Sequence, residues 1–137
     1  MGFFSSIFRC RGGHWGRFVS EMACEKNMSS QVAMTETTLR ELRKCGVGPD
    51  ALRKLEFFFY TNTDAKAACL AASLRQLGYS VEHGPSAHDA RIRLITGWTD
   101  KMSMSEQTVV DWARQMCELA RDADCEFDGW GTDARQE

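Results

Sequence analysis

The sequence has no stretch that approaches the roughly 20 consecutive apolar residues needed to cross a lipid bilayer. Its first residues carry no basic region ahead of an apolar run and no small-residue cleavage site, so they do not resemble a secretion signal. Both absences favour a cytoplasmic protein that spans no membrane.

Motifs of catalysis and metal binding are missing as well. There is no glycine-rich phosphate loop, no Gly-x-Ser-x-Gly turn that would expose a nucleophile, and no His-Glu-x-x-His helix. No two cysteines have the Cys-x-x-Cys spacing on which zinc ribbons are built. His83 and His88 flank a turn, where solvated histidines are far commoner than ligands or general bases. We therefore expect a protein that is not an enzyme and binds no metal or cofactor.

The chain also lacks the positive charge that sequence-independent binding to nucleic acids requires, because its net charge is −2. Its 137 residues, 43% hydrophobic and 26% charged, have the composition of one globular domain. Residues 1–33 are unlike the rest, since they are partly glycine-rich, polar and without a sustained period. We predict a flexible amino-terminal arm over residues 1–33 and a folded binding domain over residues 34–137.

The folded part shows alternating helical and strand patterns. Apolar residues at helical spacing, helix-ending glycines and short apolar runs identify each element. The expected order is helix 35–44, strand 53–61, helix 63–77, strand 79–83, strand 90–98, helix 103–120 and strand 125–132. Right-handed crossovers and local pairing turn this order into an α+β ferredoxin-like sandwich, βαββαβ, preceded by an extra helix. Its four-stranded antiparallel sheet carries both crossover helices on one face.

The other face of this sheet is the expected binding surface. Alternation along the aromatic strand directs Phe58 and Tyr60 away from the helices. The same reasoning assigns Arg91, Arg93 and Ile95 to this open face. Aromatic and arginine side chains anchor protein interfaces, so we predict that Phe58, Tyr60, Arg91 and Arg93 bind a partner. The alternative is that the first helix folds back over Phe58 and Tyr60.

The most unusual segment is Asp128-Gly129-Trp130-Gly131-Thr132. Glycines on both sides of a tryptophan indicate a sharply turning backbone that aims the indole at a chosen place. We expect Trp130 to seal the end of the core and Asp128 to accept backbone hydrogen bonds in the turn. A recognition loop is the functional alternative.

Several of these segments together resemble the regulator of ribonuclease activity B family. The similar pieces are the strand Phe57-Phe58-Phe59-Tyr60-Thr61, the helix ending in Leu77-Gly78-Tyr79, the helix from Met104, and the ending Phe127-Asp128-Gly129-Trp130-Gly131-Thr132. The resemblance implies a bacterial cytoplasmic protein with a ferredoxin-like fold. It also implies a non-catalytic partner that binds the endoribonuclease ribonuclease E, or a related nuclease, and lowers its activity in RNA decay.

Two departures and one competing function qualify this resemblance. The long acidic tail that family members can carry is missing, and the arm at residues 1–33 has no counterpart in the family. The competing function is direct binding of single-stranded RNA, because the same strand order occurs in RNA-recognition modules whose sheet aromatics stack on bases. Against it, the domain is acidic and the third strand offers arginines where aromatics are expected.

Overall fold

The structure is a computed structural model that describes residues 17–133. Its helices are α2 (Glu21–Lys44), α3 (Asp64–Gln76) and α4 (Glu106–Ala123). Its strands are β1 (Leu52–Arg53), β2 (Glu56–Thr61), β3 (Ser80–Pro85), β4 (Arg93–Trp98), β5 (Met102–Ser103) and β6 (Glu126–Gly131). After α2, the principal elements follow the expected order of strand, helix, strand, strand, helix and strand. The short strands β1 and β5 were not predicted from the sequence.

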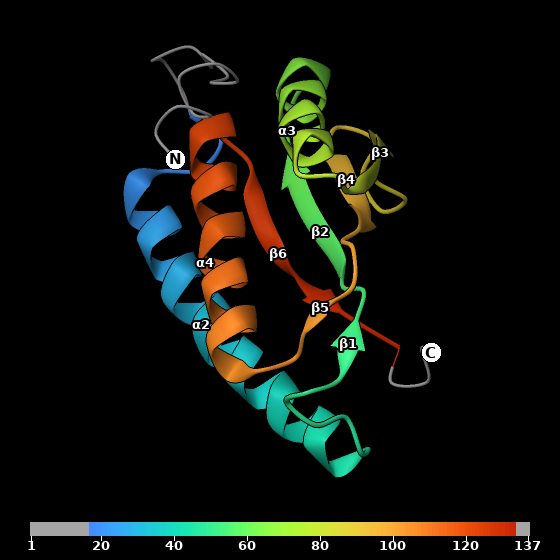
Figure 1. Cartoon of the computed structure of the whole chain (residues 1–137). Coiled ribbons are helices and arrows are strands. Elements are labelled where there is room, and N and C mark those ends of the chain that lie inside the picture. Colours follow the sequence, from blue (N-terminus) through green and yellow to red (C-terminus); the bar gives the residue numbers. More distant parts are fainter. Residues whose placement is uncertain (1–16, 134–137) are drawn as a thin grey trace.

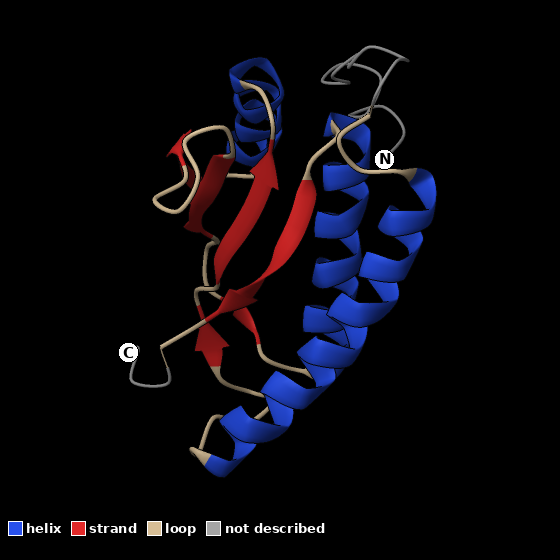
Figure 2. Ribbon diagram, turned by 180° about the vertical axis from the view of Figure 1, so that it is seen from behind, coloured by secondary structure: helices blue, strands red, loops and turns tan. Residues whose placement is uncertain are grey.

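The sheet has four antiparallel strands in the order β3-β4-β2-β6, and β1 pairs separately with β5. Helices α3 and α4 lie together on one face of the sheet, with α2 beside α4 (Figure 1). Seen from behind, α2 and α4 lie side by side next to strand β6 (Figure 2). The expected α+β architecture with a four-stranded antiparallel sheet is therefore confirmed.

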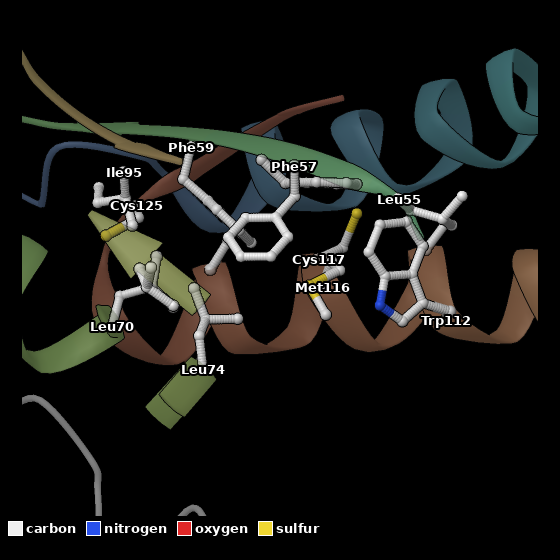
Figure 3. Close-up of a cluster of buried hydrophobic side chains, with 14 of the residues drawn as sticks. Leu55, Phe57, Phe59, Leu70, Leu74, Ile95, Trp112, Met116, Cys117 and Cys125 are labelled. Atoms are coloured by element: carbon white, nitrogen blue, oxygen red, sulfur yellow. The ribbon is translucent and has the colours of Figure 1, made fainter. Parts of the chain in front are cut away.

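Aromatic side chains of β2 and β6 fill the core between the sheet and the helices. Phe57, Phe59 and Phe127 are completely buried, and the Phe59 and Phe127 rings lie 4.9 Å apart. Leucines of α3 and the Trp112 and Met116 side chains of α4 close around them (Figure 3). Burying a side chain of this size contributes about 1.5–3 kcal/mol. Because Phe57 and Phe59 occupy alternate positions of β2, their burial determines which face of the strand packs against the helices.

Side-chain oxygens cap the first turn of each described helix. The Ser20 hydroxyl accepts a hydrogen bond from the Ala23 N–H of α2, and the Thr63 hydroxyl accepts one from the Lys66 N–H of α3. Helix α4 is capped by Ser105, two residues after the expected start of this helix at residue 103. Each cap contributes about 1 kcal/mol by satisfying an otherwise unpaired donor.

Helix α2 begins at Glu21, so the predicted arm over residues 1–33 is wrong for residues 21–33, which are helical. The sequence places the start of this helix near residue 35 because only its second half buries leucines. The buried residues of α2 are Gln31, Thr35, Leu39 and Leu42, and the first two are polar. A search for apolar residues at helical spacing does not find a helix whose buried side chains are polar. Residues 1–16 lie outside the described part of the chain.

Those polar groups bind the edge of the sheet. The side-chain amides of Asn27 and Gln31 both donate to the Phe127 carbonyl of edge strand β6, at 2.8 and 3.3 Å. Helix α2 thus packs along α4 and β6 and does not lie across the sheet (Figure 2). The alternative that the first helix folds back over Phe58 and Tyr60 is therefore wrong.

Candidate functional site

The open face of the sheet carries a row of partly exposed apolar side chains. Strand register pairs Phe58 with Thr96, Tyr60 with Leu94, and Glu56 with Trp98 on this face. Phe58, Tyr60, Leu94 and Trp98 are each partly exposed, and no described helix covers them. We call these four residues the aromatic row. They lie on the two central strands, so a partner could contact all four at once.

The predicted position of the two arginines on this face is wrong. Arg91 lies in the turn before β4, where its guanidinium bonds the Asp89 carboxylate at 3.1 Å. Arg93 begins β4 but shares the helix side with fully buried Ile95, and it pairs with Asp64 at 3.1 Å. Neither arginine can therefore join Phe58 and Tyr60 in one surface.

The prediction assigned the wrong face to each residue of β4. Adjacent Leu94 and Ile95 are both apolar, so from the sequence either could face the core. Leu94 and Trp98 were missed for the same reason. Gly97 was the signal that could have found them. A Cβ at Gly97 would lie 2.8 Å from the Phe57 ring. A strand glycine often marks such a close approach, and its neighbour Trp98 then faces the open side.

A hollow of about 170 Å³ opens where the open face meets α2. Its lining comes from α2, β2 and β6 and consists of Gln31, Met34, Thr38, Phe58, Asp128, Gly129 and Trp130. A register shift in β6 opposite Phe58 inserts one additional residue, a β-bulge. Gly129 takes φ +136° there, a conformation that L side chains rarely adopt. The bulge sets Asp128 beside the hollow.

The segment from Asp128 to Thr132 is thus mostly strand, where the sequence suggested a turn. Trp130 packs edge-on against Trp112, with ring centroids 6.2 Å apart, and its indole N–H donates to the Thr35 hydroxyl at 2.9 Å. Thr132 donates to the Lys54 carbonyl at 2.6 Å, and Gly131 ends β6. The expected backbone hydrogen bonds to Asp128 are absent among residues 17–133.

The charge of the open face is acidic. At the outward positions of the four strands, the charged side chains are Glu56, Glu82, Glu126 and Asp128. Partial burial raises the pKa of the Asp128 carboxyl above its ordinary value. Acidic groups repel phosphates and attract cationic partners, so aromatic rings surrounded by carboxylates favour a polypeptide over a nucleic acid.

Residues 33–132 match the family model described as regulator of ribonuclease activity B. The chain belongs to this family. The resemblance drawn from the aromatic strand and the Asp-Gly-Trp-Gly-Thr ending is confirmed. Membership makes the protein a non-catalytic regulator of ribonuclease activity, with ribonuclease E as the nuclease. No curated protein matches the chain.

Two cysteines of this regulator of ribonuclease activity B are buried in the core. Burial raises the pKa of the Cys117 and Cys125 thiols to about 12, so neither supplies a thiolate at neutral pH. Between residues 17 and 133, no three His, Cys, Asp or Glu side chains gather where they could hold a metal ion. None of the helices in this range is long and apolar enough to cross a membrane.

A buried carboxylate, Asp124, binds residues 18 and 19 to the part of the chain that matches the family model. Asp124, at the end of α4, is 3% exposed and adopts a left-handed φ of 56°. It accepts the backbone N–H groups of Phe18 and Val19 at 2.7 and 2.9 Å and pairs with Lys66 at 2.7 Å. In this regulator of ribonuclease activity B, the Asp124 carboxylate thus holds Phe18, Val19 and Lys66 together at the end of α4.

Proposed function

We propose that this protein lowers the activity of ribonuclease E by binding the nuclease through the aromatic row on the open face. Phe58, Tyr60, Leu94 and Trp98 provide the apolar contact, and no step of bond chemistry is involved. The observation that carries the proposal is the uncovered sheet face, because α2 packs beside the sheet and leaves these side chains partly exposed. The family match identifies ribonuclease E as the nuclease that is regulated.

The composition of the face supports a protein partner. Large rigid aromatics contribute most to the affinity of protein interfaces, provided that they are buried on binding. A contiguous apolar surface on a monomer usually marks an interaction site. The surrounding carboxylates add electrostatic complementarity, which affects association rate and partner choice more than affinity.

Two finer points belong to the same proposal. The strand order β3-β4-β2-β6, with α3 and α4 on one face, supports the ferredoxin-like arrangement of the family. The protein acts in the cytoplasm, where a regulator must meet its nuclease.

Binding of single-stranded RNA is the second candidate function, and one observation favours it. Phe58, Tyr60 and Trp98 give the face three aromatics that could stack on bases. The acidic residues around them oppose it, because single-strand binders line their grooves with positive charge. The first candidate is therefore preferred.

Inhibition assays on purified ribonuclease E test the proposal. Tyr60→Ala and Trp98→Ala should each weaken binding by about 2 kcal/mol, or about thirtyfold in Kd, as truncation of an interface anchor does. Leu52→Ala is the matched control, since Leu52 is 53% exposed on β1, away from the face. Full inhibition by both aromatic variants would refute the proposed surface.

A further inference from the structure

The hollow beside the aromatic row has features that the row does not explain. The bulge in β6 directs Asp128 toward a space bordered by the Phe58 ring, and exposed Met34 of α2 forms part of the rim. The Gln31 side chain donates its amide hydrogen to the Phe127 carbonyl, and its oxygen Oε1 lies near Gly129. The space therefore combines oxygen acceptors, an aromatic ring and a flexible thioether.

The charge in this space is uncompensated. The Asp128 carboxylate makes no ion pair and accepts no hydrogen bond from any other residue of the described range 17–133. The remaining lining residues are uncharged, namely Gln31, Met34, Thr38, Phe58, Gly129 and Trp130. The Asp128 side chain is exposed at the edge of the hollow. Its carboxylate is therefore accessible to a cation supplied by a partner.

We infer that the hollow receives an arginine side chain of ribonuclease E, which pairs with Asp128 and stacks on Phe58. This inference rests on the proposed function and names the chemistry of the partner at that site. A guanidinium is planar, forms two parallel hydrogen bonds to a carboxylate and stacks on aromatic faces. Its aliphatic stem is suited to the Met34 rim. A lysine ammonium provides neither the bidentate pairing nor the flat stacking surface.

The effect of Asp128→Asn on the Tm distinguishes a binding role of Asp128 from a structural role. Since partial burial raises the pKa of Asp128, its negative charge does not stabilise the folded protein. Asp128→Asn should therefore leave the Tm unchanged or higher while binding is lost. A residue retained for stability would show the reverse.

Titration of purified ribonuclease E into the full chain tests the pairing. Asp128→Asn should weaken binding at least tenfold, and Glu82→Gln less than threefold. Glu82 is the matched control because it is an exposed acid of the same open face, on the far edge strand β3. Equal effects of the two variants would reduce the role of Asp128 to long-range charge and overturn the inference.

Nuclear magnetic resonance tests whether the hollow binds a guanidinium group. The probes are acetyl-Gly-Arg-Gly-amide and the same peptide with uncharged citrulline, each at millimolar concentration with the full chain. The arginine peptide should shift the Gly129 amide and the Trp130 indole signals in the natural chain but not in Asp128→Asn. Equal shifts from the citrulline peptide would overturn the inference.

The two proposals fail in different ways. If Tyr60→Ala and Trp98→Ala abolish inhibition while Asp128→Asn inhibits normally, the arginine site is wrong and the proposed surface stands. If all three variants inhibit normally, the proposed surface itself is wrong, and the arginine site falls with it. Shifts produced by a single-stranded oligoribonucleotide at the same signals would assign the hollow to RNA and overturn the inference.

Discussion

Replacing Asp124 by Asn should destabilise the protein more than any comparable change at an exposed carboxylate. Asparagine keeps the shape of the side chain and tolerates the left-handed backbone at this position. It removes the charge to which Lys66 and the N–H groups of Phe18 and Val19 are bonded, all within 2.9 Å. Arg17, whose Nε lies 3.6 Å from the carboxylate, loses its counter-charge as well.

The magnitude follows from burial. Hydrogen bonds to charged groups contribute about 1.5–3 kcal/mol, and breaking a buried ion pair costs about 3–5 kcal/mol. Asparagine retains one acceptor, so we expect a loss of about 3 kcal/mol. In a domain of this size each kcal/mol lowers the Tm by about 3 °C, which gives a fall of about 10 °C.

Thermal unfolding followed by circular dichroism at several pH values is the assay. Desolvation alone would raise the pKa of Asp124, but the bonds from Lys66, Val19 and Phe18 outweigh it and hold the pKa below its ordinary value. The stabilisation is therefore present above the unfolded pKa, near 4, and is lost as the pH falls through the lower folded pKa. The difference between the natural protein and Asp124→Asn should shrink over that acidic range. A Tm within 2 °C of the natural value at pH 7 would refute the reasoning.

Three further predictions follow from single contacts. Trp130→Phe should cost about 1 kcal/mol in urea denaturation, because the Thr35 hydroxyl loses its donor; an equal cost in a Thr35→Ala background would contradict that bond. Gly97→Ala should cost about 1–3 kcal/mol, since its Cβ would lie 1.9 Å from a backbone oxygen of β3. Gly131→Ala, with nothing within 4 Å, is its control. Arg93→Ala should leave inhibition of ribonuclease E unchanged, because its side chain faces α3; lost inhibition would mean that the two faces of β4 are reversed.

The core elements could be predicted from the sequence because their burial is expressed in apolar spacing. Phe57 and Phe59 alternate along β2, and the apolar stripe of α4 recurs at helical intervals. The first half of α2 has no such stripe. Its buried contacts are made by Gln31 and Thr35 to an edge strand distant in sequence, and local patterns contain no information on such pairings.

The composition of the open face was predictable in part for a similar reason. Alternation in β2 placed Phe58 and Tyr60 on the open side, as the register confirms. In β4 the adjacent apolar residues Leu94 and Ile95 left the phase undetermined, and the partner strand decides it. The hollow beside Asp128 depends on a bulge and on the position of α2, neither of which a single-sequence pattern specifies.

The most direct test of the central claim is the rate at which purified ribonuclease E cleaves an RNA, with and without the full chain. The natural protein should lower the rate. The double variant Tyr60→Ala/Trp98→Ala, shown by circular dichroism to be folded, should leave the rate unchanged. A folded double variant that inhibits as strongly as the natural protein would contradict binding through the open face.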